Sequence, residues 1–124
     1  MKKLILTFFV LIGLSSLGFA QEASQIATTK GAKELSASKA SGNFEFTLPG
    51  NLTADQVEKN STYYTHYFTV SFDANSHKAT IEMMENTSKN RYVIARFLTA
   101  CGISHLEVDD NNIELYDFID DYLK

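Results

Sequence analysis

The chain has 124 residues, a formal net charge of −4 and a single cysteine. This length suits one small domain with a modest core, and one cysteine excludes an internal disulfide framework. The negative charge, with seven carboxylates and no basic side chain between Glu107 and Asp121, excludes nucleic acid as an expected partner.

The first twenty residues have the pattern of a secretory signal peptide. Two lysines precede an apolar run that ends at Leu17, and small residues follow at Gly18 and Ala20. A membrane anchor is the alternative, but it needs about 20 apolar residues. We therefore expect residues 1–20 to be removed, leaving an exported chain, periplasmic or secreted in a bacterial setting, that begins at Gln21.

Residues 21–42 carry no sustained apolar period. The segment is mostly Ala, Ser, Thr, Lys and Gly, which predicts a flexible N-terminal linker. A short helix around Ala32 to Lys39 is the alternative, although the segment offers no apolar face to hold it. The folded domain is accordingly expected over residues 43–124.

Two hydrophobic periods alternate from residue 43 onward. The segment "NFEFTL" (43–48) places two phenylalanines and a leucine on one face, which predicts a half-buried strand. Thr53 followed by Gln56 forms a capping box, which predicts a helix over about 54–66. "FTVSF" and "KATIEMM", joined by the turn residues "DANSH", predict a hairpin.

A second helix is predicted in "SKNRYVIARFLTACG". Ile94, Phe97, Leu98 and Cys101 stand at i, i+3, i+4 and i+7, so they form one apolar face. Gly102 occupies the position of a left-handed C-cap. The pattern therefore predicts that Cys101 is a small buried residue, with a free thiol or a dimer link as the alternatives.

The C-terminal residues predict a strand and an added arm. "HLEV" is a fourth strand, "DDNN" turns, "IEL" pairs back, and a short helix follows with Asp117 as its cap. A single helix from Ile113 to Leu123 is the alternative. The element order predicts an α+β fold, a ferredoxin-like βαββαβ sandwich with a C-terminal hairpin arm and short helix.

This order, the hairpin "FTVSFDANSHKATIEM" and the helix ending "LTACGI" resemble the heavy-metal-associated domain family over roughly Phe44 to Val108. The resemblance implies a ferredoxin-like domain over 43–124. That family binds soft metals through two cysteines in the first loop, because polarisable thiolates select such ions. Here "PGNLTAD" fills the loop without a cysteine, so the metal-binding role is not transferred to any residue.

No metal site, cofactor or catalytic group is predicted. None of the sulfur and imidazole side chains shows a C-x-x-C or H-x-x-x-H spacing, and "DDNNIE" lacks the spacing of an EF-hand. Neither a G-x-S-x-G nor an H-E-x-x-H motif occurs. The sulfur and imidazole side chains are those of His66, His77, Met83, Met84, Cys101 and His105.

A cluster of aromatic residues is the candidate binding surface. Tyr63, Tyr64 and Tyr67 lie where the first helix meets the next strand, and both periods leave some of them outside the core. The alternative is that they wrap the edge of a small core. The leading hypothesis is an exported non-enzymatic domain that binds a protein or peptide. A periplasmic metal-ion carrier with non-standard ligands is the second hypothesis, and an enzyme is the third.

Overall fold

One sheet of six strands runs through the structure, a computed structural model that describes residues 25–124. In chain order its elements are β1 (Ile26–Thr28), α2 (Ala32–Ser41), β2 (Asn43–Thr47), α3 (Ala54–Ser61), the 3₁₀ turn η1 (Thr62–Tyr64), β3 (Phe68–Asp73), β4 (Lys78–Met83), α4 (Ser88–Ala100), β5 (His105–Val108), β6 (Asn111–Glu114), α5 (Leu115–Phe118) and the π-helical turn η2 (Ile119–Leu123). The strand order is β3-β4-β2-β1-β5-β6, and among the strands of residues 25–124 only β1 and β5 pair in parallel.

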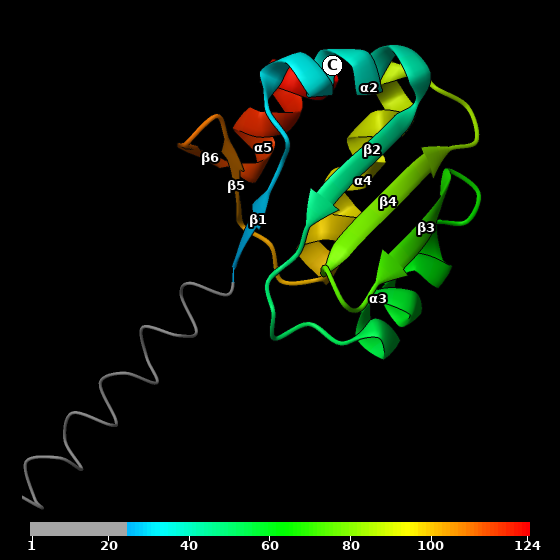
Figure 1. The fold of residues 1–124 in the computed structure, drawn as a ribbon. Coiled ribbons are helices and arrows are strands. Elements are labelled where there is room, and N and C mark those ends of the chain that lie inside the picture. Colours follow the sequence, from blue (N-terminus) through cyan, green and yellow to red (C-terminus); the bar gives the residue numbers. More distant parts are fainter. Residues whose placement is uncertain (1–24) are drawn as a thin grey trace, which may run out of the picture.

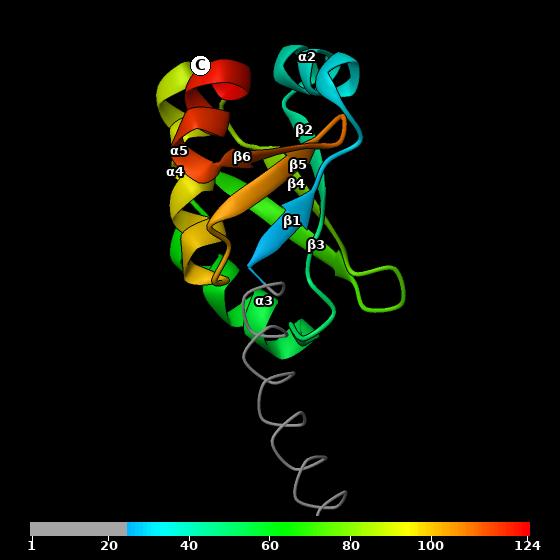
Figure 2. The ribbon, with the colours of Figure 1, turned by 90° about the vertical axis from the view of Figure 1, so that its left-hand side faces the viewer.

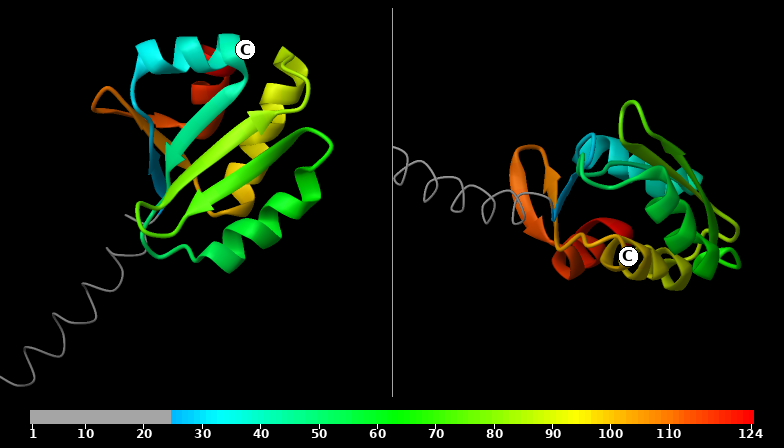
Figure 3. Two further views of the ribbon diagram at one scale, coloured as in Figure 1. Left: turned by 45° about the vertical axis from the view of Figure 1, so that its right-hand side comes forward. Right: turned by 90° about the horizontal axis from the view of Figure 1, so that it is seen from below.

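Helices cover one face of this sheet. Figure 1 looks onto the uncovered face, with α4 behind the strands and α2 across one end of the sheet. Figure 2 shows α4 and α5 together on the covered side. In Figure 3 the sheet is strongly twisted, so that β5 and β6 run at a large angle to β3 and β4. The mixed α+β fold class is thus confirmed.

Period-2 alternation decides which side chains enter the core. Phe44 and Phe46 of β2 are fully buried, while Glu45 between them faces the open side. The ring of Phe46 meets that of Phe118 edge to face, with centroids 6.1 Å apart. The C-terminal helix is therefore part of the core rather than an appended arm.

The segment expected to be a flexible linker instead supplies the middle of the sheet. Strand β1 pairs with β2 on one side and with β5 on the other, and its Ala27 has no exposed surface. The linker prediction is wrong for residues 25–42. It failed because β1 has three residues and only Ala27 faces inward, so the strand leaves almost no hydrophobic pattern.

Helix α2 is held by contacts from distant parts of the chain. Leu35 is its buried side chain, and the Ala32 N–H donates to Asp109 Oδ2 (3.0 Å), so a carboxylate lies at its positive end. At the other end Asn86 Nδ2 donates to the Lys39 carbonyl (2.8 Å). Gly31 has a φ of 137°, which side-chain-bearing residues rarely adopt, and a Cβ there would lie 2.5 Å from Asp109 Oδ1, so this position favours glycine.

The position of β1 changes the expected strand order. In a ferredoxin-like sheet, the first and last strands of the βαββαβ unit, here β2 and β5, would pair with each other. Strand β1 lies between them, so the ferredoxin-like order is not confirmed. The other part of the expected order is present, since β2, β4 and β3 are consecutive antiparallel neighbours.

Several local predictions are confirmed. Thr53 Oγ1 accepts from the Gln56 N–H, and Gln56 Oε1 accepts from the Thr53 N–H, which completes the capping box of α3. The helix itself ends at Ser61, earlier than expected, and continues as η1. After α4 the Ile103 N–H donates to the Leu98 carbonyl across Gly102, which has a positive φ of 84°.

The C-terminal arm forms a hairpin followed by a helix. Strands β5 and β6 are joined by Asp109 and Asp110, both at positive φ as in a type I′ turn. The helical residues begin at Leu115, directly after β6, rather than at a cap on Asp117. The segment therefore does not form the single helix from Ile113 to Leu123 that was the alternative prediction. The expected signal peptide, residues 1–20, lies outside the described residues.

Placing β1 in the sheet gives a direct prediction. Ala27→Lys would force an ammonium group into the centre of the core and should cost at least about 3 kcal/mol in the free energy of unfolding. Thr28→Lys puts the same group on the open face, opposite Glu107 in the register, and should change it by less than about 0.5 kcal/mol. Urea denaturation of both variants measures the difference, and equal tolerance would support the linker instead.

Candidate binding surface

Strand β3 has an edge that is unpaired within residues 25–124. Among these residues it pairs with β4 alone, and the Met84 N–H donates to the Tyr67 carbonyl (2.9 Å) just before the strand begins. Antiparallel alternation therefore turns the backbone groups of Phe68, Val70 and Phe72 away from β4. Phe68 is fully buried. The backbone N–H and C=O groups of Val70 and Phe72 form what we call the β3 edge.

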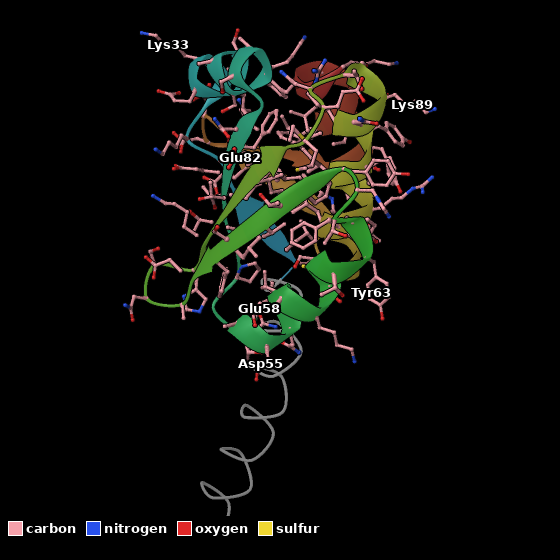
Figure 4. The ribbon with its side chains drawn as sticks, turned by 90° about the vertical axis from the view of Figure 1, so that its right-hand side faces the viewer. Lys33, Asp55, Glu58, Tyr63, Glu82 and Lys89 are labelled. Carbon is pink, nitrogen blue, oxygen red and sulfur yellow. The ribbon has the colours of Figure 1, made fainter. Side chains whose placement is uncertain are left out.

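The β3 edge lacks the features that usually protect an outer strand. Its sequence, FTVSFD, contains no proline or lysine, and its one charge is Asp73 at the far end. Figure 4 looks onto this edge and shows no strand or helix in front of β3. The opposite edge, β6, follows two aspartates and ends in Glu114, so charge protects it from strand pairing.

A hollow of about 300 Å³ opens next to the start of β3. Tyr67, the residue before the strand, forms one wall, and most of the other lining residues come from α4. We call this site the α4 hollow, and its lining residues are Tyr67, Ser88, Lys89, Tyr92, Val93, Arg96 and Lys124.

The phase of α4 explains why these side chains share the hollow. Thr87 caps the helix by accepting from the Asn90 N–H, which fixes where the helix begins. The buried stripe through Ile94, Phe97 and Leu98 then turns positions 89, 92 and 96 outward, at i, i+3 and i+7. The ring of Tyr92 therefore lies between the cationic side chains of Lys89 and Arg96 along the outward face of α4.

Arg91 fixes the same helix against the C-terminus. Its buried guanidinium donates from Nε to the Leu123 carbonyl (2.7 Å) and from a terminal nitrogen to Asn86 Oδ1 (2.7 Å). Asn86 in turn donates to the Lys39 carbonyl of α2. These bonds join α4, η2 and α2, so the wall of the hollow belongs to the rigid part of the fold.

The cations of the hollow differ in their surroundings. Lys124 lies 3.4 Å from Asp120, whereas Lys89 and Arg96 form no ion pair with any carboxylate of residues 25–124. Both side chains are exposed. On a chain with a net charge of −4, the α4 hollow therefore presents two cations, Lys89 and Arg96, beside aromatic side chains.

The structure assigns different positions to the three predicted tyrosines. Tyr63 is 71% exposed. Tyr64 is half-buried, its ring stacks on Phe68, and its hydroxyl donates to the Arg96 carbonyl (3.3 Å). Tyr67 is half-buried and lines the α4 hollow. No ring pair joins two of the three among the residues that the structure describes.

Sequence reasoning missed Lys89, Tyr92 and Arg96. They occupy the face of α4 opposite its apolar stripe, where a charged residue normally indicates only solvent exposure. Tyr92 was the detectable signal, since it interrupts that polar face. It is 42% exposed, and its ring centroid lies 6.1 Å from that of Tyr116.

The loop PGNLTAD (49–55) lies beside Cys101. Leu52, Gln56, Asn60 and Cys101 help line a hollow of about 440 Å³ there. Cys101 is buried, as predicted, and Asn60 Nδ2 lies 3.6 Å from its sulfur. Burial raises the pKa of the Cys101 thiol, and this hydrogen bond opposes the rise. The net effect is a raised pKa, which is typical of a buried thiol with a structural role.

The other sulfur and imidazole side chains are dispersed. Met84 is exposed, as the strand period predicts, and the His77 ring packs edge to face on Phe72. His105 Nδ1 lies 2.8 Å from Ser104 Oγ. Within residues 25–124, no group of three His, Cys, Asp or Glu side chains lies close enough together to hold a metal ion.

The open face of the sheet carries a polar groove along β2. Lys30 Nζ lies 2.7 Å from Glu45 Oε2, and Lys78 Nζ lies 3.9 Å from the same oxygen. The hydrogen bond from Lys30 lowers the pKa of the Glu45 carboxyl, and Glu45 raises the pKa of Lys30. All three side chains are partly exposed. The charged groups of this face thus form ion pairs with one another.

Comparison with known proteins gave no relative. Protein-family models, curated proteins and solved structures were all searched, and none matches the chain. Among the helices of residues 25–124, none has the length and apolar character needed to cross a membrane. The resemblance to heavy-metal-associated domains therefore stays a prediction.

The environment of Cys101 predicts low reactivity. Because burial raises its pKa, less thiolate forms at neutral pH, and maleimide should react at least about tenfold more slowly than with a short-peptide thiol. The rate should climb only as the pH rises beyond the usual thiol range. Cys101→Ser should cost about 1–3 kcal/mol in the free energy of unfolding. Rapid labelling together with an unchanged stability would contradict this placement.

Proposed function

We propose that this chain is an exported, non-enzymatic binding domain that takes an extended segment of a protein partner along the β3 edge. The single observation that carries the proposal is that the outward backbone groups of Val70 and Phe72 have no strand partner within residues 25–124, on a strand that contains no proline or lysine. An added strand would satisfy these donors and acceptors and extend the sheet to seven strands.

The surroundings of the edge support a peptide ligand. The outward backbone groups give hydrogen bonds that do not depend on ligand sequence, while the side chains of an added strand alternate between the two faces of the sheet. On the helix side, those near the start of β3 would meet the α4 hollow through Tyr67. The edge would supply affinity and the hollow would supply selectivity.

We also infer that the unit from β2 to β5 is a ferredoxin-like arrangement widened by β1. Its support is the order β2-α3-β3-β4-α4-β5 along the chain and the consecutive antiparallel pairing of β2, β4 and β3. A relation to heavy-metal-associated domains would then involve the scaffold, with the first loop keeping its helix cap and no thiolate pair.

Backbone substitution at the edge tests the proposed function. The mature chain, residues 21–124, would be used to select binders from a display library of random eight-residue peptides. Val70→Pro removes an N–H that points away from β4, and an edge strand tolerates this change. The variant should lower the affinity for the selected peptides at least about tenfold. Fluorescence anisotropy with labelled peptides measures the affinity.

Two matched variants separate the backbone from the side chain. Val70→Ala keeps the N–H and should leave binding within about threefold of the parent. Ser71→Pro removes an N–H that the register directs at β4, so it should lower stability markedly where Val70→Pro does not. Selected peptides that bind Val70→Pro as well as the parent would refute the proposed function.

A further inference from the structure

The charge of the α4 hollow is opposite to that of the chain. The chain carries a net charge of −4, yet three of the seven residues that line the hollow are cationic. Lys124 is engaged by Asp120, and Lys89 and Arg96 form no ion pair within residues 25–124. Cations that lack a local carboxylate are available to one supplied from outside.

The hollow also has aromatic walls. Tyr67 lines it from the position just before β3 and Tyr92 lines it from α4, and Tyr116 lies beside Tyr92 at 6.1 Å between ring centroids. Aromatic side chains combined with arginine are typical of the centres of protein interfaces. An apolar side chain could therefore lie against the rings while an adjacent anion reaches Lys89 or Arg96.

The hollow and the start of β3 are adjacent. Tyr67 lines the hollow and directly precedes Phe68, the first residue of β3. In Figure 4 Lys89 lies on the helix side of β3, and Glu82 lies on the opposite, open side. A segment paired with β3 would thus send its side chains on the helix side toward two cations.

We propose that the α4 hollow recognises a carboxylate, flanked by an apolar side chain, in the segment that pairs with β3. This inference rests on the proposed function and names the chemistry of the partner: an extended segment with an acidic residue or a terminal carboxylate near the end that meets Tyr67. Lys89 and Arg96 bind the carboxylate, and Tyr67 and Tyr92 contact the apolar neighbour. Because the rest of the chain is acidic, the bound segment should place its acidic end at the hollow rather than at the other end of β3.

Charge reversal tests the inference. Peptides selected on the parent should be enriched in Asp, Glu or a free C-terminus beside an apolar residue. The double variant Lys89→Glu with Arg96→Glu should lower the affinity for these peptides at least about tenfold. Selection repeated on that variant should enrich Lys and Arg instead, a reversal that mere structural damage would not produce.

A matched control carries the same change in net charge. Lys33 is exposed on α2, and Figure 4 shows it on the side of the molecule away from Lys89, so Lys33→Glu is compared with the single variant Lys89→Glu. Lys33→Glu should alter the affinity by less than about twofold at 0.15 M salt, where charges beyond about 8 Å are screened. An equal loss in the control would show a general charge effect and overturn the inference.

Peptide variants identify the source of the carboxylate. Each selected peptide would be made with Asp or Glu replaced by its amide, and separately with an amidated C-terminus. The replacement that weakens binding to the parent protein, and abolishes the response to charge reversal, identifies the recognised carboxylate. No response to either change refutes carboxylate recognition, while loss of binding in Val70→Pro would still support the edge itself. Indifference to Val70→Pro would refute both.

Discussion

The pairing of β1 with two neighbours is the constraint on which the architecture depends. Without it the sheet would consist of two separate parts, β3-β4-β2 and β5-β6. Ala27 can lie fully buried at this junction because its small side chain faces the packed side. With every inner strand paired on both sides, the sheet of residues 25–124 leaves two edges: β6, which follows two aspartates and ends in Glu114, and β3, whose one charge is Asp73 at its end.

Contacts between distant segments turn this sheet into a rigid support for the binding surface. Asp109, from the turn between β5 and β6, lies at the start of α2, and Asn86 binds the end of the same helix. Arg91 connects Asn86 to the Leu123 carbonyl and so anchors α4. The α4 stripe that presents Lys89 and Arg96 is consequently fixed relative to β3, which favours recognition by a preformed site.

Local patterns predicted those elements whose signal lies in consecutive residues. The capping box of α3, the hairpin of β3 and β4, and the apolar face of α4 are all of this kind. Strand β1 could not be predicted, since its stability comes from partners at positions 47 and 105–107 rather than from its own three side chains. Helix α2 was undervalued for the same reason, because Asp109 and Asn86 hold its ends.

The candidate surface was predictable only in part. Tyr67 was among the residues predicted for a binding surface and it lines the α4 hollow, but most of the other lining residues come from α4, some 20–30 residues later in the chain. The free edge of β3 depends on strand order, which period-2 alternation does not encode. Whether a cation such as Arg96 has a carboxylate beside it is likewise a property of the folded chain.

Amide hydrogen exchange along β3 tests the central claim most directly. In the free monomer, the N–H groups of Thr69 and Ser71 should be protected by β4, while those of Val70 and Phe72 should exchange quickly. Saturation with a selected peptide should protect Val70 and Phe72 and leave the other two nearly unchanged. Protection of Val70 and Phe72 already in the free monomer, or no gain of protection with saturating peptide, would contradict strand addition at this edge.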